Sequence, residues 1–227
     1  MQAGIRQQVL IDVLVPQTLF GMDSKVGAYV RDAVLILGFA ILLSLCAQIA
    51  IRIPFTIVPI TGQTFGVLLA GGALGSRKGV LSMIVYAAIG MFLLPVFAPT
   101  SGAINESLGE SGVLHFILPW SGNENWQLWS MASGGYIVGF IVAAYIIGKF
   151  AERGWDRKAN IILAFFLGNV IIYAFGLPWL AINLSVGLSK TLEWGLWPFI
   201  AGDAVKLVLA AMALPGAWAL VDRVKNR

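Results

Sequence analysis

The sequence predicts an all-α integral membrane protein of six transmembrane helices with both termini cytoplasmic, from its composition, its apolar runs and the placement of its cations. Of its 227 residues, 59% are hydrophobic and only 11% are charged, whereas soluble domains carry about 25% charged residues. A helix needs about 20 residues to cross an apolar core about 30 Å thick. Six runs approach this length: 33–51, 62–76, 79–98, 133–151, 159–182 and 197–221.

The second run, 62–76, is short and rich in glycine, so it is predicted to be a tilted or interrupted span. Six spans leave no room for a soluble domain. We therefore expect one membrane domain over residues 31–222, with a long outer loop at 99–132. Residues 1–30 are expected to form a cytoplasmic or interfacial segment, and residues 223–227 a cytoplasmic tail.

The cations are strongly asymmetric about these six runs. Arg52 and Lys190 fall on one side and Lys206 lies inside the last run. The other twelve of the fifteen lie on the side of the termini: Arg6, Lys25, Arg31, Arg77, Lys78, Lys149, Arg153, Arg157, Lys158, Arg223, Lys225 and Arg227. This is the positive-inside pattern, and it predicts cytoplasmic termini. Topology thus explains the net charge of +4, and no nucleic-acid partner is expected.

Asp203 and Lys206 form an ionisable pair inside the last run. If that helix begins near Pro198, Asp203 lies about 7 Å below its outer end. The i, i+3 spacing places both side chains on one face. Each charge costs about 2.5–3.5 kcal/mol near the bilayer centre, and such groups usually face a cavity. We favour a solute site over a purely structural ion pair, for a solute with both an N–H donor and a carbonyl or carboxylate.

Other polar side chains within the runs could join this pair. They are Gln63, Tyr136, Asn169 and Tyr173. Asn169 and Tyr173 are i, i+4 and share a helix face. Taken alone, each is more often a hydrogen bond between packed helices than a ligand contact, and only their combination makes the two explanations about equal.

Small residues recur four positions apart in three of the runs, which permits close helix approach. The pairs and triplet are Ala40 with Ser44, Gly71 with Gly75, and Gly135 with Gly139 and Ala143. In the second and fourth runs, packing within the chain is the expected use. On the first run, a surface-facing stripe would suit a partner helix.

The chain lacks the motifs of the common energy-using and catalytic sites. There is no phosphate-binding loop, no cluster of His, Cys and carboxylates for a metal, and no nucleophile elbow. We therefore expect no enzyme, no cofactor and no metal. Uphill transport would need a partner protein or an ion gradient.

Several motifs in order resemble one family. They are Arg-Ile-Pro-Phe-Thr-Ile-Val-Pro-Ile-Thr-Gly-Gln-Thr-Phe-Gly-Val-Leu-Leu-Ala-Gly at 52–71, Leu-Gly-Ser-Arg-Lys-Gly at 74–79, Gly90 with Leu-Pro-Val-Phe-Ala at 94–98, Gly-Gly-Tyr at 134–136 with Gly139 and Phe140, and Pro198-Phe199 with Gly202, Asp203 and Lys206. The sequence from about 31 to 222 is similar to the BioY family, the biotin-specific substrate-binding (S) components of energy-coupling-factor (ECF) transporters.

The resemblance implies a six-helix S component in a bacterial or archaeal cytoplasmic membrane, surrounded by lipid, that binds biotin near its outer face. It implies substrate contacts from the last helix and from earlier polar and glycine positions: Asp203, Lys206, Asn169, Tyr173, Gln63, Tyr136 and Gly135. Asp203 and Asn169 are expected to meet the ureido group, with Lys206 giving electrostatic support or meeting a carbonyl. Biotin is then the substrate and not a cofactor.

Partners are implied in the same way. S components dock on a transmembrane coupling (T) protein that carries two ATPase subunits, and Ala40 and Ser44 of the first span are where this docking is expected.

The 99–132 loop and the N-terminal extension of about 30 residues are longer than the family pattern. The alternatives are an S component or stand-alone transporter for another vitamin-sized solute, and a small membrane enzyme or assembly factor.

Overall fold

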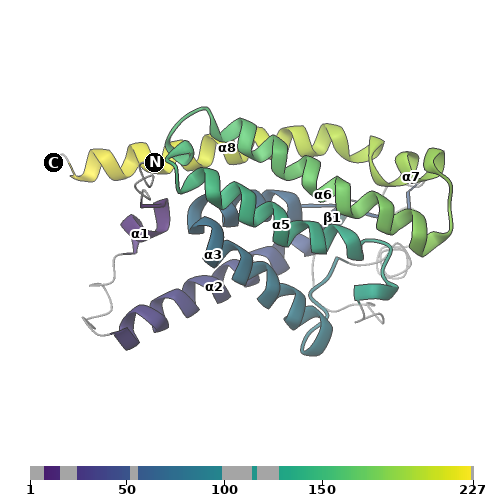
Figure 1. The fold of residues 1–227 in the computed structure, drawn as a ribbon, viewed down its shortest axis with the longest axis horizontal. Helices are drawn as coiled ribbons and strands as arrows, with labels where there is room; N and C mark the ends of the chain where they lie inside the picture. The colour runs from purple at the N-terminus through teal and green to yellow at the C-terminus, as the bar shows by residue number, and fades with distance from the viewer. Residues whose placement is uncertain (1–7, 16–24, 52–55, 99–113, 117–127, 226–227) are drawn as a thin grey trace, which may run out of the picture.

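The computed structural model describes residues 8–15, 25–51, 56–98, 114–116 and 128–225. The helices and strands are α1 Leu10–Leu14, α2 Lys25–Gln48, β1 Ile49–Ile51, β2 Ile60–Thr61, α3 Gln63–Phe92, β3 Leu114–Phe116, η2 Leu128–Ser130, α5 Gly134–Ala151, η3 Trp155–Arg157, α6 Ile161–Leu184, α7 Leu188–Gly195 and α8 Trp197–Lys225. Figure 1 shows α1 and the C-terminal end of α8 at one end of the bundle, called here the terminal end. Helix α7 lies at the opposite end, called the pocket end.

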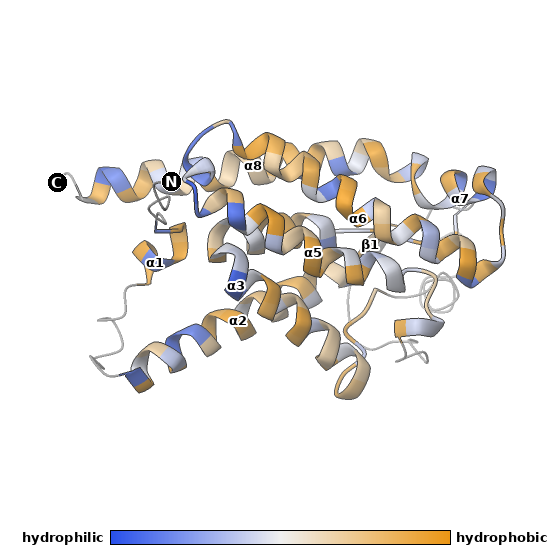
Figure 2. Cartoon of the chain, viewed as in Figure 1, coloured by the Kyte–Doolittle hydropathy of each residue, from blue (hydrophilic) through white to orange (hydrophobic). Residues whose placement is uncertain are grey.

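Five helical segments in the described chain are long and apolar enough to cross a membrane. They are Lys25–Gln48, Gln63–Phe92, Gly134–Ala151, Ile161–Leu184 and Leu188–Val224. Figure 2 shows apolar residues along α2, α6 and α8, and the exposed faces of these helices carry Leu37, Phe166 and Val208. Such faces suit lipid, because a soluble protein rarely exposes large contiguous apolar patches. The predicted all-helical membrane class is confirmed.

Helix α3 changes direction at Gly75, whose φ of 78° and ψ of 179° are not helical. The side chain of Gln63 donates a 2.8 Å hydrogen bond to the hydroxyl of Tyr86. In a continuous helix these residues would lie about 34 Å apart, so the two arms of α3 must fold back on each other. Only glycine adopts such a backbone conformation without strain. The arms correspond to the predicted runs 62–76 and 79–98.

Close contacts at glycine bring α3, α5 and α6 together. A Cβ added to Gly148 of α5 would lie 2.2 Å from the backbone nitrogen of Ser76, and one added to Gly71 would lie 3.0 Å from the carbonyl oxygen of Ala144. On the other side of α5, Gly139 would meet the backbone of Ile172 in α6. The prediction that the small residues of the second and fourth runs serve packing within the chain is confirmed.

Two predicted helix ends were wrong. The first run was expected to continue to residue 51, but α2 ends at Gln48 and the next three residues form β1. The run at 79–98 was expected to be helical throughout, but α3 ends at Phe92. Strand β1 pairs antiparallel with β2 and with β3 in a small sheet of order β2-β1-β3, which the all-α prediction did not include.

The small sheet fixes the position of the residues that lie directly before α3. Ala50 pairs with Thr61, and Ile51 with Ile60. At the end of α2, the side-chain amide of Gln48 donates to the carbonyls of Val96 and Phe97. The pocket end of α2 is therefore joined to the segments before and after α3. Most of the predicted 99–132 loop lies outside the described residues.

Candidate functional site

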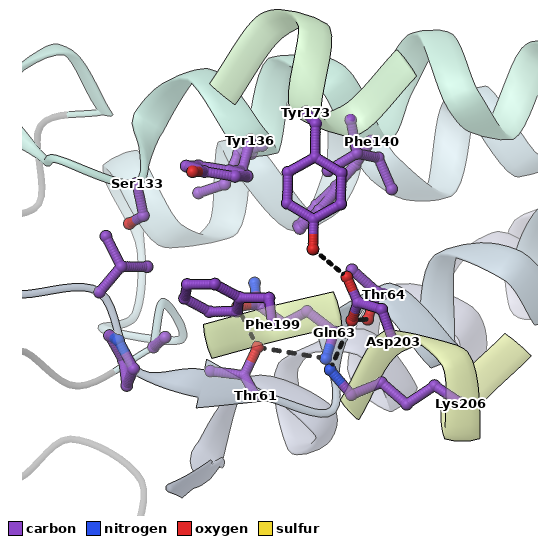
Figure 3. Close-up of a pocket in the computed structure, with 15 residues that line it drawn as sticks. Thr61, Gln63, Thr64, Ser133, Tyr136, Phe140, Tyr173, Phe199, Asp203 and Lys206 are labelled. Carbon is purple, nitrogen blue, oxygen red and sulfur yellow. Dashed lines mark hydrogen bonds and ion pairs between the residues drawn. The ribbon is translucent and has the colours of Figure 1, made fainter. Parts of the chain in front are cut away.

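An apolar pocket with a few polar groups lies at the pocket end, between the start of α3 and helices α5, α6 and α8 (Figure 3). The space between its lining residues is about 570 Å³, a volume that includes open solvent at the mouth. The lining residues are Val58, Pro59, Thr61, Gln63, Thr64, Ala98, Ser133, Tyr136, Ile137, Phe140, Ile172, Tyr173, Phe199, Asp203 and Lys206.

The carboxylate of Asp203 is the most heavily bonded polar group in the pocket. The Lys206 ammonium, one helical turn further along α8, donates to Oδ1 at 2.9 Å. The hydroxyl of Thr64 in α3 donates to the same oxygen at 2.9 Å, and the hydroxyl of Tyr173 in α6 donates to Oδ2. Three helices thus fix one carboxylate (Figure 3).

Lys206 keeps hydrogen-bonding capacity for a ligand. An ammonium has three donors, and Asp203 is its one hydrogen-bond partner among the described residues. The side chain of Lys206 is 15% exposed and that of Asp203 is 7% exposed. The pair therefore lies in a largely water-excluded wall, where polar contacts with a ligand are stronger than in water. Oδ2 of Asp203 also keeps acceptor capacity, because each carboxylate oxygen accepts about two hydrogen bonds.

Gln63 lines the pocket, but its amide is engaged within the protein. Its Nε2 donates to the Tyr86 hydroxyl, and its Oε1 accepts from the Thr61 hydroxyl at 2.9 Å. These bonds orient the amide and leave it one donor and one acceptor position. In the described structure Gln63 acts first as a bridge between the two arms of α3.

Tyr136 and Tyr173 form one wall of the pocket. Their rings meet edge to face, with centroids 6.2 Å apart. The Tyr136 hydroxyl donates to the carbonyl oxygen of Gly195 at 2.9 Å, which ties α5 to the end of α7. Gly176 permits this arrangement, because a Cβ there would lie 2.4 Å from the Tyr136 ring.

A second hydroxyl group beside the pocket contacts α7. The Thr56 side chain donates to the carbonyl oxygen of Trp194 at 2.7 Å. Nearby, Val58, Leu180 and Phe199 form a small buried apolar cluster against which the Trp194 side chain packs. Segment 56–61 and α7 are therefore joined by a hydrogen bond and by apolar contacts.

Two of the predicted substrate-binding residues do not line the pocket. Asn169 is buried one turn of α6 away from Tyr173, and its Oδ1 has no hydrogen-bond partner among the described residues. Gly135 packs on the side of α5 that faces Trp179, where an added Cβ would lie 2.2 Å from the Trp179 Cβ. The shared face of Asn169 and Tyr173 was a sound expectation, but the pocket does not extend that far along α6.

The predicted partner stripe on α2 is wrong for Ala40. Ala40 is fully buried in the core of this chain, and Ser44 is half-buried with its hydroxyl donating to the carbonyl of Ala40. The exposed face of α2 instead carries large apolar side chains, among them Leu37, Ile41 and Leu45. The close approach of α2 and α3 is at Gly66 of α3, where an added Cβ would lie 3.0 Å from the Leu43 side chain.

Sequence reasoning did not identify Thr64 or the apolar walls. Thr64 directly follows Gln63, but nothing in the sequence indicates that its hydroxyl reaches a carboxylate 139 positions later. Phe140, Ile172 and Phe199 look like any apolar residue of a membrane helix, and only the fold turns them toward the pocket.

Comparisons with known proteins agree with this architecture. The chain matches the model of the BioY family over residues 17–117 and 112–223. It is 31% identical over 191 residues to the biotin transporter BioY of Rhizobium etli, covering 80% of this chain and 90% of that protein. It is 35% identical over 182 residues to the probable biotin transporter BioY of Pyrococcus horikoshii, covering 80% and 93%.

Among solved structures, the fold is similar to a crystal structure of the S-component for biotin from an ECF-type ABC transporter. The TM-score is 0.64 at 21% identity, covering 91% of this chain and 96% of that one. At this identity the likeness bears on the fold alone, which is that of an S component. The family model spans nearly all of the described helices, and the chain belongs to the BioY family.

Proposed function

We propose that this chain is the biotin-binding substrate component of an ECF-type vitamin uptake transporter, energised by partner ATPases. The observation that carries the proposal is the Asp203–Lys206 pair, held in the wall of an otherwise apolar pocket. The named relatives are transporters, so the alternative of a small membrane enzyme or assembly factor is set aside. An S component for another vitamin-sized solute remains the second candidate.

The chemistry of biotin suits the pocket. Its ureido group presents an N–H donor beside a carbonyl acceptor, and the sulfur-containing ring fused to it is apolar. Asp203 Oδ2 can accept from the N–H while Lys206 donates to the carbonyl, two charge-assisted hydrogen bonds on adjacent groups. Tyr136, Tyr173 and Phe199 would then contact the rings. Asn169 has no direct role in this proposal, because it does not line the pocket.

The chain is a multi-pass membrane protein, and we propose that it crosses six times with both termini cytoplasmic. Helix α3 is one of the five candidate segments, and each of its two arms would make a short crossing of its own. Counting the arms separately gives six crossings. The cations of the terminal end, such as Lys78 and Arg153, would then face the cytoplasm, and the pocket would open outside. Residues 1–30 and 223–227 would form the cytoplasmic segments that flank the membrane domain.

Partners are part of the same proposal. The chain would assemble with a transmembrane coupling protein and two ATPase subunits, and it would use no cofactor, because biotin is its substrate. The exposed apolar face of α2, with Leu37, Ile41 and Leu45, is proposed as the docking surface in place of Ala40.

Biotin titration of the purified protein tests the proposal. We expect saturable binding that Asp203→Asn and Lys206→Ala each weaken strongly. Asp222→Asn is the matched control, because this exposed residue lies on the same helix near the terminal end. Biotin affinity that is unchanged in both pocket variants would contradict the site. Thermal stabilisation by a different vitamin, with none by biotin, would favour the second candidate.

A further inference from the structure

Helix α1 packs between the splayed end of α2 and the rest of the bundle. It has five residues, too few for a stable isolated helix in water. Its position is held by packing, since Val9 and Leu10 are only 3% and 5% exposed. Val9 lies against the turn at Gly75, and the carbonyl of Gln8 accepts a hydrogen bond from Arg157.

One carboxylate oxygen of α1 joins two other helices. Oδ1 of Asp12 accepts from Lys78 of α3 at 2.6 Å and from Arg31 of α2 at 2.9 Å. Arg31 also donates to two backbone carbonyls of this segment, those of Val15 at 2.6 Å and Ile11 at 3.3 Å. We call Asp12, Arg31 and Lys78 the brace.

A second carboxylate near the same cations makes weaker contacts. Oδ1 of Asp32 lies 3.4 Å from Arg31 and 3.7 Å from Lys78, and its side chain is 43% exposed. The Arg31 side chain is only 4% exposed, so the loss of its main counter-charge would leave a buried cation poorly compensated. Asp12, at shorter distances, is the dominant partner of both cations.

The brace acts where α2 has little other support. Five of the seven buried residues of α2 lie between Ala40 and Gln48, in its pocket half. In the other half, only Gly27 and Arg31 are buried. Figure 1 shows this half diverging from the bundle, with α1 on the side toward α8. The pocket end of α2 is fixed separately, by β1 and by the Gln48 hydrogen bonds.

The charge of Asp12 is suited to a permanent contact. Burial by itself would raise the pKa of its carboxyl, but the hydrogen bonds and charges of Lys78 and Arg31 outweigh burial and hold that pKa below its usual value of 3.8. Asp12 therefore stays ionised at physiological pH.

We infer that α1 fixes the angle between α2 and the bundle through the brace, so that α2 can pivot about its pocket end when the ion pairs of Asp12 open. The inference goes beyond the proposed function, and its test does not depend on biotin. It assigns a conformational role to the N-terminal segment that the family resemblance does not cover. It also identifies the half of α2 that contains Gly27 and Arg31 as the part of the membrane domain whose position this segment controls.

Hydrogen–deuterium exchange of the full chain in nanodiscs tests the inference, with Asp12→Asn compared with Asp32→Asn. A charge-assisted hydrogen bond contributes about 1.5–3 kcal/mol, so we expect amides of residues 10–15 and 26–33 to exchange about tenfold faster or more in Asp12→Asn. The Asp32→Asn control should stay within about twofold of the parent, because its contacts are long and exposed. Exchange in the pocket half of α2 should not change in either variant.

Equal exchange in the two variants would overturn the inference. If Asp12→Asn does not elute as a monodisperse protein, Lys78→Met provides a milder test, because it leaves Asp12 paired with Arg31. Faster exchange of residues 10–15 in Lys78→Met supports the brace, and exchange equal to that of the parent contradicts it.

Discussion

Gly148 lies at a close backbone contact between α5 and α3, and Gly148→Ala should destabilise the protein. The added Cβ would lie 2.2 Å from the backbone nitrogen and 2.4 Å from the Cα of Ser76. No side-chain rotation relieves a backbone contact, so the helices must separate by about 1 Å to restore van der Waals distance. Overpacking of this kind costs about 1–3 kcal/mol.

The separation should also weaken a buried polar contact. The backbone N–H and the hydroxyl of Ser76 both donate to Oε1 of Glu152, at 2.9 and 2.7 Å, and hydrogen bonds to charged groups contribute about 1.5–3 kcal/mol. Alanine gains up to about 1 kcal/mol in helix propensity over glycine, which offsets part of the loss. The expected net loss is therefore about 2–4 kcal/mol, or a Tm lower by about 4–16 °C for a chain of this size.

Thermal unfolding followed by tryptophan fluorescence measures this effect, with Gly216→Ala as the matched control. Gly216 also lies within a helix, but an added Cβ meets nothing within 4 Å. Its replacement should leave the Tm unchanged or raise it slightly. A Gly148→Ala protein that melts at or above the control temperature would refute the close-packing argument.

Three further predictions concern the pocket and the loop between α5 and α6. Tyr136→Phe leaves the Gly195 carbonyl without its donor, so α7 amides should exchange faster while α6 amides stay protected. Thr64→Val removes one of three donors to Asp203 and should weaken biotin binding about three- to tenfold, as titration would measure. Burial, opposed by an indole hydrogen bond and a nearby guanidinium, raises the pKa of Asp156 above 3.8. Its stabilising contribution is thus fully present below pH 3.8 and is lost as pH rises through the raised pKa, so Asp156→Asn should flatten this part of the Tm-against-pH curve.

The helices were predictable because bilayer thickness imposes a length on apolar runs. Their ends were less predictable, since Ile49–Ile51 is as apolar as the helix before it and only pairing with β2 makes it a strand. The short run at 62–76 was recognisable from its glycines, but the reversal of chain direction between the two arms of α3 depends on the backbone conformation of Gly75. Local composition therefore located the elements, and contacts between distant segments set their boundaries.

In the candidate site, too, local composition predicted some residues, and contacts between distant segments determined the rest. Asp203 and Lys206 stood out because charges in an apolar helix are costly, and the structure pairs them at 2.9 Å. Asn169 was expected on the same face as Tyr173, but helix periodicity does not say how deep a pocket extends. Thr64 gave no signal, because a threonine in a membrane helix costs little whether or not its hydroxyl meets a carboxylate.

The three donors on Asp203 have a consequence for selectivity. Lys206, Thr64 and Tyr173 hold the carboxylate in one orientation before any solute enters, so little rotational freedom is left to lose on binding. A solute whose N–H falls at the remaining lone pair gains the full contact, whereas one whose donor is displaced cannot draw the carboxylate toward it without breaking bonds to other helices. If the pocket is the solute site, the rigidity that stabilises the helix bundle here would also narrow the range of solutes that it accepts.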